Sequence, residues 1–267
     1  MISVIIPVYN SSDTILSSLE SVKNQSYKEL EIIIVNDGST DDSLQLIEQF
    51  IERNKGLNFV LINQYNQGVS KARNVGMEKA NGDWIALLDS DDKWLSNKLE
   101  IQLQVLLENP HIDFLGTNRN DEILKDFLHI KIGKLTKLSA KDLLYKMFFV
   151  TSTVIFKKEI LTEIGFFDEK QKYCEDANYF IKIARKKETY LLNESLIVFG
   201  GDKAFFGEKG LSSNLWEMQK GEIKNLKYAL DSKVVNHIEY GSLYLFLMLK
   251  YFRRVLLVKK KRLFFYN

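Results

Sequence analysis

The chain has little of what builds disulfide frameworks, zinc sites or rigid linkers. Its 267 residues include 1 cysteine, 3 histidines and 2 prolines. The single cysteine, Cys174, excludes an intramolecular disulfide and fits a reducing cytoplasm. Three scattered histidines do not predict a zinc site built from histidine and cysteine. With no low-complexity linker and no internal repeat, we expect one large domain or a domain with an appendage.

The chain also has no large excess of positive or negative charge and no long apolar run. The formal net charge is only +2, so no nucleic-acid partner is expected. Residues 2–8 are too short for the core of a signal peptide, lack a basic leader and contain a proline. Residues 243–258 come nearest to a membrane span, but Lys250, Arg253 and Arg254 interrupt them. We therefore expect a cytoplasmic protein.

The strongest local signal is a short apolar run that ends in acids. Residues 85–88 predict a buried strand, and Asp89, Asp91 and Asp92 follow at its end. Three carboxylates there repel each other and resist desolvation, so a compensating cation is expected. Mg²⁺ or Mn²⁺, completed by substrate phosphates, fits the spacing of Asp89 and Asp91. A solvated turn with Asp92 or Ser90 capping the next helix is the alternative.

Strands and helices alternate through the first hundred residues. Apolar, β-branched runs predict four strands, at residues 3–8, 31–35, 59–62 and 84–88. The alternation predicts an α/β fold with an open, mostly parallel sheet and helices on both faces. Ligands of such sheets bind beyond the carboxyl ends of the strands. The polar clusters Tyr9-Asn10, Asn36-Asp37-Gly38 and Asp89-Ser90-Asp91 all fall at strand ends, so we expect them to share one site.

Three charged side chains near these clusters are candidates for nucleotide contacts. Asp37 could accept a hydrogen bond from a base N–H or a ribose hydroxyl. Lys71 and Arg73 stand early in a helix predicted for residues 68–80 and could meet a diphosphate. An ordinary solvated helix face is the alternative for both. Glycine-rich phosphate loops of the dinucleotide-binding and P-loop types are absent.

Four motifs, in this order, give the chain a family resemblance. They are Ser3-Val-Ile-Ile-Pro-Val-Tyr-Asn10, Ile34-Val-Asn-Asp-Gly-Ser-Thr-Asp41, Asn66-Gln-Gly-Val-Ser-Lys-Ala-Arg-Asn74 and Leu87-Leu-Asp-Ser-Asp-Asp92. With them the first hundred or so residues resemble a glycosyltransferase of family 2, and the resemblance continues more weakly to about residue 200. Asn36 departs from the pattern, because many relatives carry a second aspartate beside Asp37. Asp37 would then be the sole base-reading acid of its turn.

The resemblance implies the GT-A fold and an inverting transfer from a nucleoside-diphosphate sugar, expected to be a UDP-sugar. The acceptor would be a glycan or a lipid-linked saccharide of bacterial surface polysaccharide or lipooligosaccharide synthesis. Six residues would contact the nucleotide-sugar: Pro7, Tyr9, Asp37, Arg73, Asp89 and Ser90. Asp91, with Asp89 as a second candidate, would ligate the Mn²⁺ or Mg²⁺ that bridges the diphosphate.

The second half of the chain has to supply the acceptor side and a base. We expect strands at residues 111–116 and 150–156, a strand pair at 189–199 and a mobile, polar loop at 117–141. A glutamate–aspartate pair supplies the general base in family 2, which implies that Asp176, with Glu175 in reserve, deprotonates the attacking hydroxyl. Acids are also ordinary at a helix N-terminus. Cys174 beside them is expected to be a packing residue.

The last part of the chain is glycine-rich and then basic. Residues 200–210 could close over the diphosphate with Lys203 or Lys209 supplying charge, or could be a plain linker. After Glu239 there is no acidic residue, and seven basic residues alternate with apolar ones: Lys250, Arg253, Arg254, Lys259, Lys260, Lys261 and Arg262. This predicts a basic amphipathic segment on an anionic membrane surface, at the inner face of the cell membrane. A helix docked on the body is the alternative.

These observations predict a division of the chain and leave two competing functions. A GT-A domain would cover residues 1–210, with a nucleotide-sugar half at 1–116 and an acceptor half at 117–210, and a helical extension would cover 211–267. A sugar nucleotidyltransferase would need a glycine-rich loop after the first strand, and none is present there. The other alternative is a nucleotide-sugar-binding or membrane-scaffold protein that catalyses no reaction. The presence of Asp89, Asp91 and Asp176 argues against it.

Overall fold

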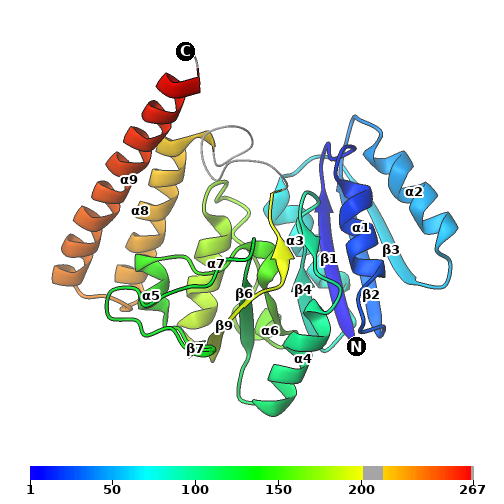
Figure 1. Ribbon diagram of the computed structural model, residues 1–267, viewed down its shortest axis with the longest axis horizontal. Coiled ribbons are helices and arrows are strands. Elements are labelled where there is room, and N and C mark those ends of the chain that lie inside the picture. The colour runs from blue at the N-terminus through cyan, green and yellow to red at the C-terminus, as the bar shows by residue number, and fades with distance from the viewer. Residues whose placement is uncertain (201–212, 266–267) are drawn as a thin grey trace.

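The computed structural model describes residues 1–200 and 213–265, with side chains to residue 260. Across these residues an eight-stranded sheet runs in the order β3-β2-β1-β4-β8-β6-β9-β7 (Figure 1). Its strands are β1 (Ile2–Val8), β2 (Leu30–Asp37), β3 (Asn58–Gln64), β4 (Trp84–Leu87), β6 (Phe114–Asn118), β7 (Leu135–Lys137), β8 (Ile155–Lys157) and β9 (Thr189–Ser195). A two-stranded sheet joins β5 (Lys93–Trp94) to β10 (Ile197–Val198).

Strand direction brings many strand ends to one edge of the sheet. Strands β3, β2, β1 and β4 are parallel neighbours. Because β8 runs antiparallel to both β4 and β6, β6 points the same way as β4, and β9 is parallel to β6. The carboxyl ends of β1, β2, β4, β6 and β9 therefore lie on one side, where β8 begins. The predicted open, mostly parallel sheet is confirmed.

Helices cover both faces of this sheet. They are α1 (Ile15–Lys23), α2 (Ser43–Arg53), α3 (Val69–Lys79), α4 (Lys98–Glu108), α5 (Ala140–Tyr145), α6 (Ile160–Glu163), α7 (Glu175–Ala184), α8 (Leu215–Asp231) and α9 (His237–Phe265). Helices α1, α2 and α4 contribute to the apolar core on one face, and the remaining helices contribute to the core on the other. Alternate residues of β2 separate accordingly, Ile32 toward the first core and Ile33 toward the second, as a pleated strand requires.

Helix α3 lies unusually close to the sheet. A Cβ atom added at Gly76 would stand 2.5 Å from Cγ2 of Ile5 and 3.3 Å from Cγ2 of Val35. Only a glycine allows this approach, so residues near the start of α3 reach the carboxyl edge of the sheet at short range.

Three expectations for the second half of the chain need correction. The strand predicted at 150–156 begins only at Ile155, because Thr153 closes a 3-10 turn over Thr151–Thr153 by donating its hydroxyl to Val150 O. Residues 189–199 are not a strand pair, since β9 and β10 belong to different sheets. Residues 117–141 are not simply polar and irregular, because they contain β7 and bury side chains, among them Leu124 and Ile130.

Helices α8 and α9 form an antiparallel pair at one end of the molecule, beside α5 and α7 (Figure 1). Leu226 of α8 and Leu243 and Leu247 of α9 are buried in the core that covers α7. Within residues 1–200 and 213–265, no helix has the length and apolar character needed to span a bilayer. The predicted division of the chain at residue 210 stays a prediction. The two proposed halves before it, 1–116 and 117–210, both contribute strands to one sheet.

Candidate active site

The loops that follow β1, β2 and β4 are tied to one another at the carboxyl edge. Asn10 has a positive φ of 48°, and its side-chain oxygen accepts a hydrogen bond from the backbone N–H of Thr40 at 2.8 Å. The hydroxyls of Ser11 and Ser90 are 2.8 Å apart. The three polar clusters expected to share a site therefore do lie together.

Asp37 holds the turn that leads into α3. Its carboxylate is buried and accepts hydrogen bonds from the backbone N–H groups of Gln67 and Gly68, at 2.9 and 2.8 Å, and from the side chain of Gln64 at 2.7 Å. Pro7 is buried within β1, whereas the Tyr9 side chain at the strand end is exposed. Of the predicted nucleobase contacts, Tyr9 is thus the one that presents a free ring face at this edge.

The acids after β4 have distinct surroundings. Asp92 is buried, accepts a hydrogen bond from the Ser152 hydroxyl and accepts another from the N–H of Gly200 at 2.7 Å. Burial and the charge of Asp89 raise the pKa of Asp92 to about 7. Asp91 is half-buried on the same turn. The alternative in which Asp92 or Ser90 caps the next helix is wrong, because α4 begins at Lys98.

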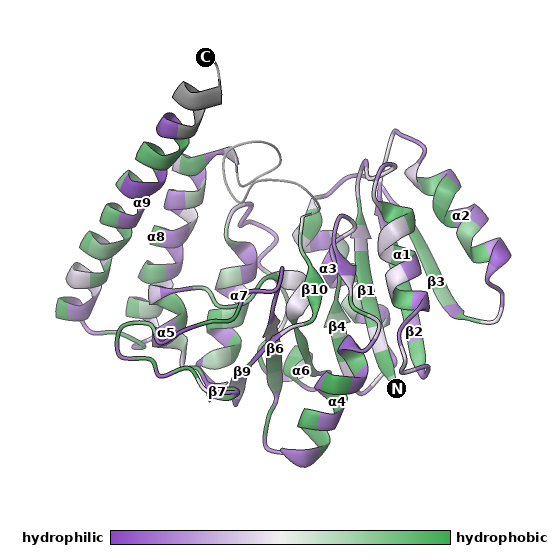
Figure 2. Ribbon diagram, in the orientation of Figure 1, coloured by the Kyte–Doolittle hydropathy of each residue, from purple (hydrophilic) through white to green (hydrophobic). Residues whose placement is uncertain are grey.

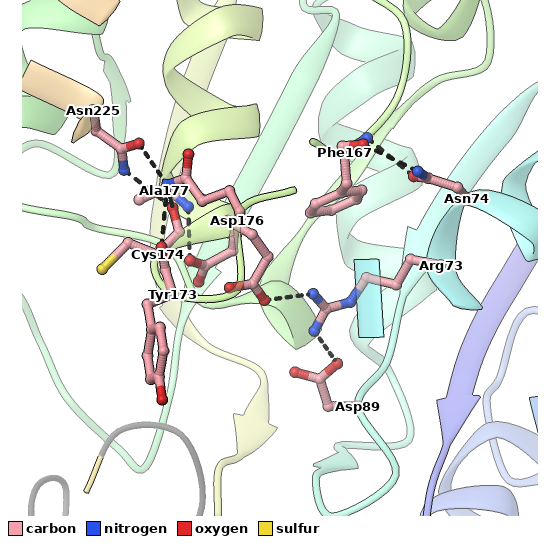
Figure 3. A network of polar contacts seen from close by, with 11 residues as sticks. Arg73, Asn74, Asp89, Phe167, Tyr173, Cys174, Asp176, Ala177 and Asn225 are labelled. Atoms are coloured by element: carbon pink, nitrogen blue, oxygen red, sulfur yellow. Dashed lines mark hydrogen bonds and ion pairs between the residues drawn. The ribbon is translucent and has the colours of Figure 1, made fainter. Parts of the chain in front are cut away.

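Arg73 connects this turn to the start of α7. The side chain is almost fully buried, and its two terminal nitrogens donate to Asp89 at 2.7 Å and to Glu175 at 3.0 Å (Figure 3). Its guanidinium also stands 5.3 Å from the ring centre of Phe167. Although burial lowers the pKa of Arg73, the charges of Asp89 and Glu175 more than offset it and leave the pKa above its usual value. Arg73 is therefore a buried bridge between two acids.

The acidic pair opens α7 from a left-handed residue. Cys174 has φ 54° and ψ 33°, and Glu175 and Asp176 follow in the first helical turn. Burial, with the charge of Asp176, raises the pKa of Glu175 to about 7, and burial raises the pKa of Asp176. Burial also raises the pKa of the Cys174 thiol, which makes it a poor nucleophile and fits the expected packing role.

Lys71, the other cation proposed to meet a diphosphate, pairs with Glu169 at 3.2 Å. Lys203 and Lys209, proposed for a closing loop, lie outside the described residues. Two site residues escaped the sequence reasoning. Ser152 bonds Asp92 and also accepts the N–H of Asp89 at 3.0 Å. Its only signal was a run of hydroxyl residues inside an expected strand.

Arg119 is the second residue that was missed. It follows β6 at the carboxyl edge, and its guanidinium stands 5.0 Å from the ring centre of Phe199. Burial lowers its pKa, while the charges of Glu122, Asp92 and Asp176 raise it, so it lies among the acids of the site. The signal was present, because a cation directly after an expected strand falls at the same edge as the acids.

The residues present fit a divalent cation that takes most of its ligands from a substrate. The charges of Asp89, Glu175 and Asp176 act on Arg73, and those of Glu122, Asp92 and Asp176 act on Arg119. The charge of Asp91 acts on Asp92. The excess negative charge favours a cation. Among the described residues no group of three or more histidine, cysteine or acidic side chains has the geometry of a complete metal site. Mg²⁺ and Mn²⁺ bind in this way, through one or two carboxylates and substrate phosphates.

Comparison with known sequences adds a family. A family model described as Glycosyl transferase family 2 matches residues 3–165. The UDP-Glc:alpha-D-GlcNAc-diphosphoundecaprenol beta-1,3-glucosyltransferase WfgD of Escherichia coli is 33% identical over 178 residues, which cover 65% of this chain and 67% of WfgD. The matches to three further relatives span only 16%, 43% and 62% of the lengths of those relatives.

Comparison with solved structures establishes the fold. TarS of S. aureus (residues 1–349, with UDP-GlcNAc) matches with a TM-score of 0.68 at 23% identity, over 91% of this chain and 70% of TarS. The mannosyltransferase PcManGT of Pyrobaculum calidifontis, solved with GDP-Man and Mn²⁺, matches with a TM-score of 0.68 at 19% identity, over 86% and 64% of the two chains. The predicted GT-A fold is confirmed, and the match includes residues well beyond 165.

Proposed function

The chain belongs to glycosyl transferase family 2, and we propose that it transfers a sugar, with inversion, from a nucleoside-diphosphate sugar to a hydroxyl of a lipid-linked glycan. One observation carries this proposal: Arg73 links Asp89, at the end of β4, to Glu175, the neighbour of Asp176. A transferase needs charge control at its leaving diphosphate and a base at the attacking hydroxyl. The bridge holds acids suited to both tasks at one edge of the sheet.

Asp176 is the proposed general base. An attacking sugar hydroxyl is a weak nucleophile, and a nearby carboxylate removes its proton as the new bond forms. Glu175 is committed to Arg73 and almost fully buried, whereas Asp176 is half-buried and keeps a carboxylate oxygen that is not used by Ala177 N. A pKa above the usual range of an aspartate also makes Asp176 a stronger base. Direct displacement then inverts the anomeric centre.

Asp91 is the proposed ligand of Mg²⁺ or Mn²⁺, because Asp89 is paired with Arg73. The cation would stabilise the charge on the leaving nucleoside diphosphate. The Mn²⁺ named with PcManGT supports this assignment by analogy of fold. On the nucleotide side, Tyr9 is proposed to pack against the base at the end of β1, with Pro7 and Asp37 shaping the pocket and Ser90 at its floor.

The names of the relatives suggest the substrates. WfgD is named for UDP-Glc and for α-D-GlcNAc-diphosphoundecaprenol, which supports a UDP-sugar donor and a diphospholipid-linked acceptor here, in bacterial surface-glycan synthesis. Arg119 is the proposed contact for the acceptor diphosphate. It comes from β6, on the Asp176 side of the sheet, and an acceptor whose sugar is joined directly to diphosphate brings that anion close to the base.

Such an acceptor lies in a membrane, and α9 is the proposed contact with that surface. Its outer face exposes apolar side chains at heptad spacing, Ile238, Leu245, Leu249, Phe252 and Leu256. Arg253 and Lys259 are exposed beside them, and no acidic residue follows Glu239. An apolar stripe with basic neighbours is complementary to an anionic bilayer. The proposed location is therefore peripheral, on the inner face of the cell membrane.

The test of the function is Asp176→Asn. We expect UDP-sugar binding, measured by calorimetry with Mn²⁺, to match the parent while transfer to a lipid-linked acceptor falls between about 10² and 10⁴-fold. Glu175→Gln, measured in the same assay, should lose less transfer activity than Asp176→Asn. EDTA should weaken UDP binding to both proteins. Unchanged transfer by Asp176→Asn would refute the assignment of the base, and a parent protein that binds UDP-sugars without transfer would favour a binding or scaffold protein.

A further inference from the structure

The start of α7 depends on a residue in an uncommon conformation. Non-glycine residues seldom adopt a left-handed backbone, yet Cys174 does so immediately before the acidic pair. The turn of the chain at Cys174 decides where the next two side chains point. Something outside α7 must hold this turn, because the local sequence does not favour it.

Asn225 of α8 supplies a direct hold. Its side-chain N–H donates to the carbonyl oxygen of Cys174 at 3.0 Å (Figure 3). Its side-chain oxygen accepts from Gln171 at 2.8 Å and from Asn178 at 3.1 Å. All three carboxamide residues are 3% exposed. Gln171 donates to the same carbonyl of Cys174 at 3.1 Å. These hydrogen bonds tie the three buried amides to one another and to the turn at Cys174, while the side-chain oxygens of Gln171 and Asn178 have no hydrogen-bond partner within the described residues.

A whole face of α8 lies against this turn. Met218, Gly221 and Asn225 are spaced three and four residues apart, so they share one side of the helix. The Cys174 thiol contacts Met218 O at 3.4 Å. A Cβ atom at Gly221 would stand 2.5 Å from the carbonyl oxygen of Tyr173. The backbone of α8 therefore touches the chain just before the acidic pair.

Helix α9 fixes α8 in turn. Arg254 donates to both carboxylate oxygens of Glu222 at 3.0 and 2.9 Å, and to the side chain of Gln219 at 2.9 Å. Glu222 and Gln219 both stand on α8, within two turns of Asn225. Helices α8 and α9 lie outside the residues matched by the family model, so this support is not part of the shared nucleotide-sugar half.

We propose that Asn225 is a positioning residue for the base: through its hydrogen bond to Cys174 O it fixes the left-handed turn and thereby aims Asp176 at the acceptor hydroxyl. The inference rests on the proposed function, since it takes Asp176 as the base. Helix α8 would then help to position the base, a role that no sequence motif indicates.

The test separates the rate of the chemical step from substrate binding. For Asn225→Ala we expect kcat to fall by about 10²-fold, because displacing a catalytic group by about 1 Å costs about that much in rate. The KM for acceptor and the affinity for UDP should stay within about twofold of the parent values. Gly221→Ala, which pushes α8 away from Tyr173, should give the same split. Assays run well below each variant's unfolding temperature.

Two controls bear on stability. Lys227→Ala changes the solvent face of α8, and Ile47→Ala removes buried contacts of α2 on the opposite face of the sheet. Both should keep the parent kcat, even though the second unfolds at a lower temperature. A parent kcat in Asn225→Ala or Gly221→Ala, or an equal loss of UDP affinity, would overturn the positioning role alone. An inactive parent protein would overturn the proposed function with it.

Discussion

At the scale of single residues, acids outnumber cations in the described part of the candidate site. Arg73 is one cation shared between Asp89 and Glu175, with Asp176 close by. Burial disfavours the charged forms of Glu175 and Asp176, and the charges of neighbouring acids add to this effect, whereas Arg73 acts against it. This is the physical reason for the raised pKa of Glu175 and Asp176.

The pH dependence of transfer follows from these raised pKa values. The base must be ionised, so kcat/KM should fall as pH drops through the raised pKa of Asp176. Glu175→Gln removes a neighbouring negative charge and should move this acid limb to lower pH, as a rate profile would measure. Glu169→Gln, which changes an acid paired with Lys71 on the surface, is the matched control and should leave the limb in place. A limb that moves upward in Glu175→Gln would contradict the account.

The same variant has an expected effect on stability. Burial raises the pKa of Glu175 from 4.5 to about 7 on folding, so ionising it costs the folded state stability as pH rises through that interval. In the absence of nucleotide and metal, the difference in unfolding temperature between Glu175→Gln and the parent should therefore grow in favour of the variant as pH rises from 4.5 to about 7.

Arg119 carries a prediction about the acceptor. Arg119→Met should raise the KM for a sugar-diphosphate-lipid about tenfold or more, the effect of one lost charged hydrogen bond. The KM for an alkyl glycoside of the same sugar should stay unchanged, because that acceptor lacks the anion. Arg53→Met, at an exposed position of α2, is the control. Weaker UDP binding in Arg119→Met would instead assign this arginine to the donor.

At the scale of elements, α9 has two faces with different chemistry. Figure 2 shows hydrophilic and hydrophobic residues alternating along this helix at the edge of the molecule. Arg254 pairs with Glu222, and Lys250 donates to Tyr145 O at 3.3 Å, with burial lowering its pKa. These two basic residues, expected at the membrane surface from sequence, in fact dock α9 on the body. Among the described side chains of α9, the exposed positive charges are those of Arg253, Lys259 and Lys260.

Leu249→Glu combined with Phe252→Glu tests the outer face. Each side chain is more than half exposed, at 69% and 55%, so the pair should fold normally. We expect the fraction bound to vesicles of phosphatidylglycerol and phosphatidylethanolamine to fall at least about tenfold in a sedimentation assay. Leu107→Glu on α4, where the leucine is also exposed, should bind like the parent. Unchanged vesicle binding would assign the stripe to another partner, such as a second copy of this chain if the parent protein self-associates and the variant does not.

At the scale of the whole molecule, sequence predicted best where signals are local. Apolar runs ending in polar residues located β1, β2 and β4 and their shared edge, because strand periodicity and parallel connection are short-range rules. The bond from Asn225 to Cys174 joins residues 51 positions apart. Neither residue carries a motif, so that contact needed the structure. The 3-10 turn at Thr153 was missed because the Thr153 hydroxyl, by donating to the backbone carbonyl of Val150, overrode the β-branched pattern.

The Arg73 bridge also has a consequence for how the chain acquires its shape. The two residues it joins at α3 and α7 are 102 positions apart, whereas the pairings among β1 to β4 form within the first ninety residues. Contacts of long sequence separation form late, because closing a long loop has to precede them. During synthesis, strands β1 to β4 can therefore assemble while α7 and α8 are still absent. We therefore expect a protein shortened before α7 to keep the pairing of these strands and to lack the Arg73 bridge that completes the proposed catalytic edge.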